Sequence, residues 1–208
     1  MVEALELLDL HYESFFSIAK VAEETGHPVP MDTRGWSQIL CSVLTGIRGV
    51  DRKKGADLVD GSDVKGANTW MAIDTPRFNG VIKAGTQATT SGRLESLDSM
   101  PHLYFVLWDV SPRGNHRCRV WVVRPDSDIN FRGMALLWYK AREAGTIKSD
   151  NFQLHPPRGL DSDEIRNTCG NLIYPLYFSA EIEPGIGYVL QTFDEDARTS
   201  GVCVTSSS

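Results

Sequence analysis

Hydrophobic residues recur at intervals of three and four along the first part of the chain. Over residues 2–24 this spacing predicts one amphipathic helix, which Gly26 and the prolines after it end. A second helix is expected to follow Thr33 and to end between Gly46 and Gly49. Two helices are therefore predicted to precede the rest of the fold.

The middle of the chain changes from helical to extended patterns. Residues 56–67 predict a β-hairpin with its turn at Asp60-Gly61. The uninterrupted apolar run over residues 103–110 predicts a buried strand, and residues 117–123 predict a partner strand. We expect these strands to form the centre of a sheet.

The remaining segments alternate between loops, helices and strands. Residues 85–99 are polar and predict a long surface loop, whereas the composition of residues 130–144 favours a helix. Residues 161–164 suggest the acidic start of a helix, residues 186–193 a strand, and residues 205–208 a disordered end.

This order of elements predicts an α/β or α+β fold with a central mixed β-sheet flanked by helices. The chain has 208 residues, 41% of them hydrophobic, which is enough for one well-filled core. We expect a single domain over residues 1–208, with a core of about residues 35–145 and a C-terminal extension of about residues 146–208.

Several classes of protein are disfavoured by the sequence. It contains no uninterrupted apolar run long enough for a membrane span, and the acidic residues 1–9 do not resemble a secretory signal. The four cysteines are scattered, which argues against a disulfide framework and against zinc spacing. A cytoplasmic location with no membrane partner is expected.

Charge is unevenly distributed along the chain, whose net charge is −6. Residues 48–158 hold 17 basic and 12 acidic side chains, while residues 1–47 and 159–208 are both acidic. A basic middle suggests an anionic partner there, although surface charge can also cluster by chance.

The segment with the most chemistry contains Asp57, Asp63 and Lys65. On a strand, Asp63 and Lys65 point to the same face because the side-chain period is two. Carboxylates are the ligands that Mg²⁺ prefers, and a lysine beside them can position a water or offset charge on a phosphate. The segment thus predicts a magnesium site beside a positive group.

The length of the hairpin loop decides whether the first aspartate belongs to this site. A two-residue turn turns Asp57 away from Asp63 and Lys65, whereas a three-residue loop places all three on one face. The metal site therefore requires the longer loop or a bulge, which Gly61 permits. The alternative is an ordinary surface hairpin with a salt pair.

Residues 54–70 and 72–79 extend this motif into a recognisable pattern. A helix, an acid, a turn and a strand carrying Asp63-Val64-Lys65 resemble the PD-(D/E)XK nuclease superfamily, and the wider run resembles the MamI-type group of type II restriction endonucleases. By motif, the resemblance covers about residues 35–90.

The resemblance implies a restriction-endonuclease-like core and Mg²⁺-dependent, site-specific hydrolysis of double-stranded DNA that leaves 5′-phosphates. It implies that Asp57, Asp63 and the Val64 carbonyl hold the metal and that Lys65 orients the attacking water. It also implies a homodimer, whose two-fold symmetry matches that of a palindromic site.

Two departures from the family pattern leave alternatives open. No proline precedes Asp57, and the gap to Asp63 is short, so Asp51 or Asp60 could be the first acid instead. A glutamate of the N-terminal helix could also support the metal, the candidates being Glu3, Glu6, Glu13 and Glu23.

Candidate DNA contacts flank the motif on both sides. Basic residues precede it, and side chains of the types that read bases follow it; either group could also be ordinary surface. These residues are Arg52, Lys53, Lys54, Thr69, Arg77, Asn79, Lys83 and Gln87.

Two other functions remain compatible with the sequence. One is a repair or recombination nuclease of the Holliday-junction-resolvase type, and the other is a non-catalytic module that binds DNA or protein. A P-loop NTPase and a GxSxG hydrolase are excluded because neither motif is present.

Overall fold

The computed structural model describes most of the chain. The described residues are 1–25, 33–50, 55–70, 75–82, 94–157 and 161–206.

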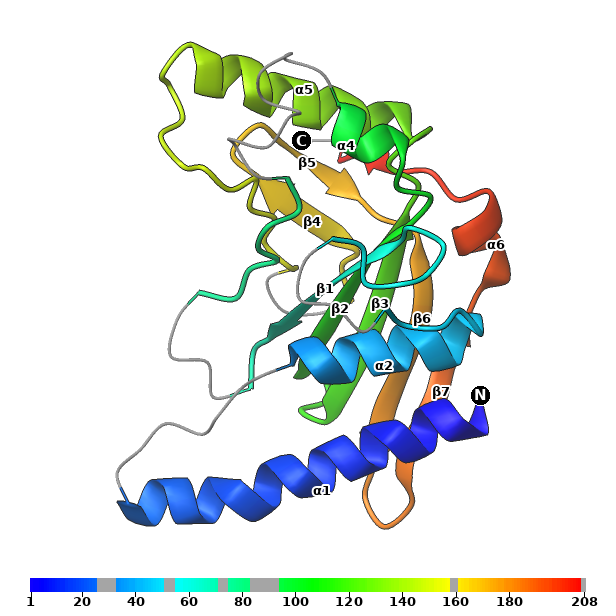
Figure 1. The fold of residues 1–208 in the computed structure, drawn as a ribbon. Helices are drawn as coiled ribbons and strands as arrows, with labels where there is room; N and C mark the ends of the chain where they lie inside the picture. The colour runs from blue at the N-terminus through cyan, green and yellow to red at the C-terminus, as the bar shows by residue number, and fades with distance from the viewer. Residues whose placement is uncertain (26–32, 51–54, 71–74, 83–93, 158–160, 207–208) are drawn as a thin grey trace.

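Two helices begin the fold, as the hydrophobic spacing predicts. Helix α1 spans Val2–Thr25 and α2 spans Arg34–Thr45, and the N–H of Gly46 closes the end of α2 by donating to the Ser42 carbonyl. Both helices pack on one face of the central sheet (Figure 1).

The central sheet has five strands in the order β1-β2-β3-β6-β7. The strands are β1 (Asp63–Asn68), β2 (Leu103–Val110), β3 (His116–Val123), β6 (Leu176–Glu183) and β7 (Gly187–Phe193). Strand β1 lies at an edge and runs parallel to β2, while the other neighbours are antiparallel. The predicted mixed sheet and the strands predicted at 103–110, 117–123 and 186–193 are confirmed.

Three further helices and a smaller sheet complete the described fold. They are α4 (Glu95–Asp98), α5 (Ile129–Glu143), α6 (Glu195–Thr199) and the three-stranded sheet β4 (Glu164–Asn167), β5 (Gly170–Ile173) and β8 (Val204–Thr205). Helix α5 confirms the helix predicted over residues 130–144.

The hairpin predicted over residues 56–67 is wrong. The N–H groups of Asp57 and Leu58 both donate to the Ser62 carbonyl, and Gly61 N–H donates to the Leu58 carbonyl, so a tight turn precedes β1. Gly61 takes φ +98° in this turn, a conformation open to glycine. Strand β1 pairs with β2 instead, which buries Val64 and Ala67 on opposite faces of the sheet.

The helix start predicted at residues 161–164 is also wrong. Arg117 donates to Asp161 and Trp121 to Asp163, so alternate side chains of β3 hold this segment extended into β4. The last part of the surface loop predicted over residues 85–99 forms α4. The disordered end predicted over residues 205–208 is wrong at Thr205, which pairs with Leu172 in β8.

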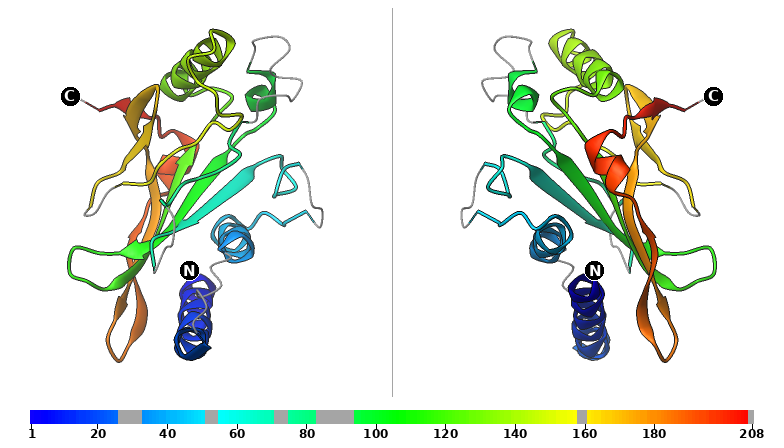
Figure 2. Two further views of the ribbon diagram at one scale, coloured as in Figure 1. Left: turned by 90° about the vertical axis from the view of Figure 1, so that its left-hand side faces the viewer. Right: turned by 90° about the vertical axis from the view of Figure 1, so that its right-hand side faces the viewer.

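Two hydrophobic layers cover the two faces of the sheet. Even-numbered residues of β2, such as Val106 and Trp108, pack beneath α1 and α2. Odd-numbered residues, such as Phe105 and Leu107, pack beneath α5 and the smaller sheet. Figure 2 shows α1 and α2 on one side of the central sheet and α5 on the other. Among the described residues, no helix has the length and apolar character needed to cross a bilayer.

Candidate active site

Asp57, Asp63 and Lys65 converge at the start of the edge strand β1. The Lys65 ammonium lies 2.5 Å from Asp63 Oδ2, as expected for two residues on one face of a strand. The Val64 N–H donates to Asp57 Oδ2 at 2.9 Å and to Asp63 Oδ1 at 3.0 Å. One backbone donor therefore gathers both carboxylates, although the predicted hairpin does not form.

The position of Val64 follows from the pairing of β1 with β2. Asp63 N–H donates to the His102 carbonyl and Thr69 N–H to that of Trp108, so odd-numbered residues of β1 direct their backbone groups toward β2. Because backbone groups alternate along a strand, the N–H and C=O of Val64 face the open edge of the sheet. The Val64 carbonyl thus lies on the same edge as the two carboxylates.

Helix α2 fixes the other side of Asp57. Gln38 donates to Asp57 Oδ1 at 2.6 Å, and Arg34 lies 4.0 Å from the same oxygen. The close packing of α2 on β1 depends on Gly66, where a Cβ would lie only 2.6 Å from Ser37 Oγ. Sequence reasoning missed Gln38, because nothing in the sequence links a helix residue to an aspartate 19 positions away.

The two carboxyls repel each other in a partly dry environment. Burial raises the pKa of Asp57 to about 7, and the adjacent Asp63 carboxyl adds to the shift, while the Val64 N–H and Lys65 oppose it. Asp57 and Asp63 are 8% and 12% exposed at their side chains. At high pH the two carboxylates have only one close cation, Lys65, because the other, Arg34, is 4.0 Å from Asp57 and 65% exposed at its side chain.

The donor set fits a hard divalent cation. Mg²⁺ takes one or two carboxylates and keeps several waters, and here two carboxylates and a carbonyl share one edge. A cation between the carboxylates would also relieve the repulsion that raises the pKa of Asp57. Within the described ranges, no group of three or more His, Cys, Asp or Glu side chains is placed to hold a metal.

Of the alternative acids, the structure places Asp60 in the turn before β1 and Glu3 near Asp57. Asp60 accepts from the N–H and hydroxyl of Ser62 within the turn, at 2.9 and 2.8 Å. Asp51 lies outside the described residues, as does the side chain of Glu23. Glu3 lines a groove of about 700 Å³ together with Gln38 and Asp57.

The candidate DNA contacts divide into three groups. Thr69 is tied to the Trp108 carbonyl at the far end of β1, away from Asp63. Arg77 and Asn79 share a polar hollow with Asn151 and Gln153, which the sequence reasoning missed. Outside the described residues lie Arg52, Lys53, Lys54, Lys83 and Gln87.

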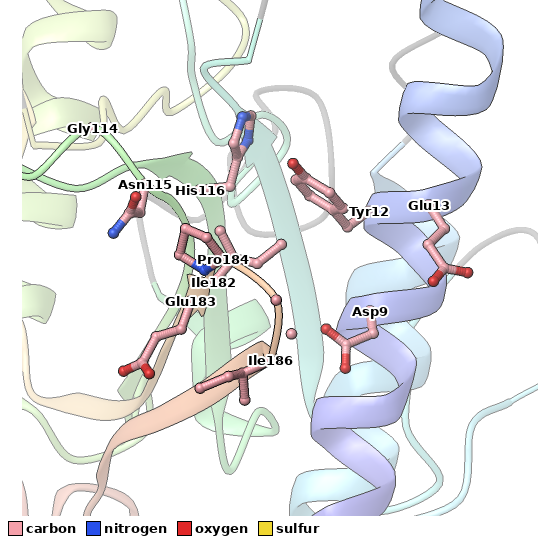
Figure 3. Close-up of a pocket in the computed structure, with 12 residues that line it drawn as sticks. Asp9, Tyr12, Glu13, Gly114, Asn115, His116, Ile182, Glu183, Pro184 and Ile186 are labelled. Carbon is pink, nitrogen blue, oxygen red and sulfur yellow. The ribbon is translucent and has the colours of Figure 1, made fainter.

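A separate hollow of about 560 Å³ lies between α1 and the β6–β7 turn. Figure 3 shows Asp9 and Tyr12 pointing from α1 toward it, with His116 on the opposite wall. His116 begins β3 and pairs with Val110, seven residues along β2 from the partner of Asp63, or roughly 23 Å away. This hollow contains none of the candidate catalytic residues.

A mixed five-stranded sheet whose edge strand presents an acid and a lysine two residues apart, with helices packed over it, has the restriction-endonuclease-like fold. The sequence model of the MamI restriction endonuclease family matches residues 20–185. The chain therefore belongs to the MamI restriction endonuclease family.

One curated relative is the type II restriction enzyme MamI of Microbacterium ammoniaphilum. It is 31% identical over 190 residues, which cover 84% of this chain and 60% of the relative. The chain thus spans less than two thirds of the relative's length. No solved structure matches it.

Proposed function

We propose that this protein is a Mg²⁺-dependent type II restriction endonuclease that cleaves double-stranded DNA at a specific site and leaves 5′-phosphates. The observation that carries the proposal is the convergence of Asp57, Asp63 and Lys65 on the open edge of β1. Membership of the MamI family supports the same reaction class.

Each group has a distinct part in the proposed reaction. Asp57, Asp63 and the Val64 carbonyl would hold Mg²⁺, which when bound stabilises the negative charge that develops on the scissile phosphate. Lys65 donates a hydrogen bond that orients the attacking water. The water oxygen bonds to phosphorus and loses a proton to solvent, while the bond to the 3′ oxygen breaks and that oxygen takes a proton from solvent. The products are a 5′-phosphate and a 3′-hydroxyl.

Helix α2 has a supporting part. Gln38 donates to Asp57 Oδ1 and Val64 N–H donates to Asp57 Oδ2, so both oxygens of this carboxylate are positioned before a metal arrives. Such pre-positioning lowers the cost of assembling the site.

The proposed partners follow from the same function. Arg52, Lys53 and Lys54 precede the site in sequence and are proposed to contact phosphates, while Thr69, Lys83 and Gln87 are further candidates for DNA contact. We propose a homodimer, because two-fold symmetry matches a palindromic site. A cytoplasmic location fits an enzyme that acts on DNA.

Cleavage of unmethylated phage DNA tests the function directly. The purified protein is incubated with the DNA in Mg²⁺ and in EDTA, beside Lys65→Ala and the control Lys140→Ala, whose lysine is exposed on α5. Discrete bands are expected from wild type and Lys140→Ala in Mg²⁺, and none from Lys65→Ala or in EDTA.

Two results would contradict the proposal in different ways. Cleavage only of branched DNA would instead identify a junction resolvase. DNA binding that is unchanged in Lys65→Ala, with no cleavage of any substrate, would identify a non-catalytic binding module.

A further inference from the structure

A small polar surface lies beside the candidate active site and is built from two segments more than 70 residues apart in sequence. Residues 78–82 and 152–154 run antiparallel, and we call this pair the ribbon. Phe78 N–H donates to the Leu154 carbonyl at 2.8 Å, and Phe152 N–H donates to the Ile82 carbonyl at 2.9 Å. The ribbon therefore has an inner and an outer side.

The inner side of the ribbon is apolar and firmly packed. Phe78, Phe152 and Leu154 are fully buried. The ring of Phe152 lies 5.5 Å from that of Trp138 on α5. The side chain of Asn167 on β4 donates to the Gln153 carbonyl at 2.5 Å, which ties the ribbon to the smaller sheet. The outer side is thus presented on a fixed support.

The outer side carries only polar side chains. Arg77, Asn79, Asn151 and Gln153 alternate with the buried residues and line a hollow of about 420 Å³ with Gly80. One guanidinium and three amides can each make paired hydrogen bonds to a planar partner. Arginine pairs in this way with guanine, and Asn or Gln with adenine, in the major groove of DNA.

The ribbon lies on the same face of the sheet as the catalytic residues. The ring of Phe78 is 5.0 Å from that of Phe105, and Phe105 is the direct neighbour of Lys65 in the pairing of β2 with β1. A two-stranded ribbon is also a shape that the major groove admits. A duplex whose backbone reaches Lys65 would therefore lie close to the outer side of the ribbon.

We propose that Asn151 and Gln153, together with Arg77 and Asn79, read base edges of duplex DNA and determine which sequence is cleaved. The proposal rests on the proposed nuclease function, which it deepens. It assigns sequence discrimination to the ribbon, while general affinity for DNA comes from phosphate contacts elsewhere.

Selection of binding sites tests the proposal independently of cleavage. Lys65→Ala protein, in Mg²⁺, selects from a library of random duplexes, and the selected consensus is compared with a scrambled duplex. The Asn151→Ala/Gln153→Ala pair is then added to the same protein. We expect the preference for the consensus to fall by about tenfold or more, with affinity for the scrambled duplex changed less than about twofold.

Two further variants separate base reading from folding. Asn151→Asp/Gln153→Glu keeps the shape of both side chains. It is expected to lose the preference for the consensus to the same extent as the alanine pair, with an unchanged unfolding midpoint. Gln191→Ala, an exposed amide on the opposite edge strand β7, is expected to keep the preference.

Failure of this inference is distinguishable from failure of the nuclease function. The inference is overturned if the alanine pair keeps the wild-type preference, if it weakens both duplexes equally, or if no consensus is selected at all. A consensus that depends on Asn151 and Gln153 supports it even when wild-type protein cleaves nothing, a result that counts only against the nuclease function.

Discussion

Two clusters of buried charge lie on one face of the central sheet, at opposite ends, and they are balanced differently. At one end, Asp57 and Asp63 share one backbone donor and have Lys65 as their near cation. At the other end, Asp109 lies between Arg117 and Arg119, at 2.9 and 2.6 Å. In the first cluster the second cation, Arg34, is largely exposed and 4.0 Å from Asp57, whereas the second cluster is closed by further partners.

The closing partners of the second cluster come from residues 161–163. Arg117 pairs with Asp161 at 2.6 Å, and Arg119 donates to the Ser162 carbonyl at 2.9 Å. Arg119 also lies over the ring of Trp121, 4.7 Å from its centroid. Internal compensation makes this cluster a structural clamp between β3 and the smaller sheet, while the Asp57–Asp63 cluster is the one that we propose binds an external cation. Five changes test this contrast.

The largest expected effect is the fall in the rate of DNA cleavage in the Asp57→Asn variant. In Mg²⁺ the rate of cleavage should fall by about 10²–10⁴-fold, because one of the two carboxylates that would hold the metal is lost. Without metal at pH 8, the free energy of unfolding should rise by about 1–2 kcal/mol, since an ionised Asp57 is disfavoured in the fold. Initial cleavage rates and urea unfolding measure the two effects.

Asp126→Asn, at an exposed position, is the matched control for this prediction and should change neither quantity. Full cleavage activity in Asp57→Asn would remove Asp57 from the site.

Removing the acid of the clamp should instead cost stability. Asp109→Asn leaves Arg117 and Arg119 buried without their shared carboxylate, and we expect a loss of about 3–5 kcal/mol in the free energy of unfolding. Asp161→Asn removes a partner of Arg117 that is 79% exposed and should cost less than about 1 kcal/mol. Equal effects of the two substitutions in urea unfolding would contradict the clamp.

The buried His11 has no charged partner among the described residues, and its response to pH provides a further comparison with the two clusters. His11 packs on the rings of Trp36 and Trp108, and burial lowers its pKa from 6.5 to about 4. The unfolded chain then binds a proton that the fold excludes, so stability is complete above pH 6.5 and falls as pH drops toward 4.

The expected loss is at most about 3 kcal/mol over this range, and His11→Phe should remove it. Unfolding measured from pH 4 to 7, with His155→Gln as the matched control, tests this. A pH profile that is identical in His11→Phe and wild type would show that His11 is not responsible.

Added Mg²⁺ should stabilise the protein through the Asp57–Asp63 cluster alone. At 100 times its dissociation constant, Mg²⁺ would add about 2.7 kcal/mol to the free energy of unfolding. Wild type and Asp109→Asn should show the same increment, while Asp57→Asn should show little. Thermal unfolding across a Mg²⁺ titration distinguishes these cases, and an equal increment in all three proteins would place the ion elsewhere.

The smallest expected effect comes from Gln38→Ala. Loss of one hydrogen bond to Asp57, worth about 1 kcal/mol, should weaken Mg²⁺ binding about fivefold. The Mg²⁺ affinity of Gln38→Glu should differ from that of Gln38→Ala, because glutamate adds a carboxylate to the site. Calorimetric Mg²⁺ titration measures both, and unchanged affinity in Gln38→Ala would exclude a positioning role.

Local sequence patterns account for much of the fold. Period-3.6 spacing located α1 and α2, the apolar run located β2, and the period of two placed Asp63 and Lys65 on one face. Each of these depends on interactions within a few residues. The resemblance carried by residues 54–79 indicated the family for the same reason, since its motif is contiguous.

Where a local pattern allowed two partners, sequence reasoning chose the wrong one. The hairpin was wrong because β1 pairs with β2, about 40 residues later, rather than with the residues before it. The helix start at residues 161–164 was wrong because Arg117 and Trp121 hold that segment extended.

The sequence by itself therefore determined helices α1, α2 and α5, strands β2, β3 and β7, the family and the three catalytic candidates, whereas it did not reveal the central strand β6. Tertiary structure alone decided how Asp57 reaches Asp63, that Gln38 anchors it, and that Asn151 and Gln153 join Arg77 and Asn79. The physical reason is that side-chain periodicity is set by the local backbone, whereas strand pairing and helix packing are set by burial between segments far apart in the chain.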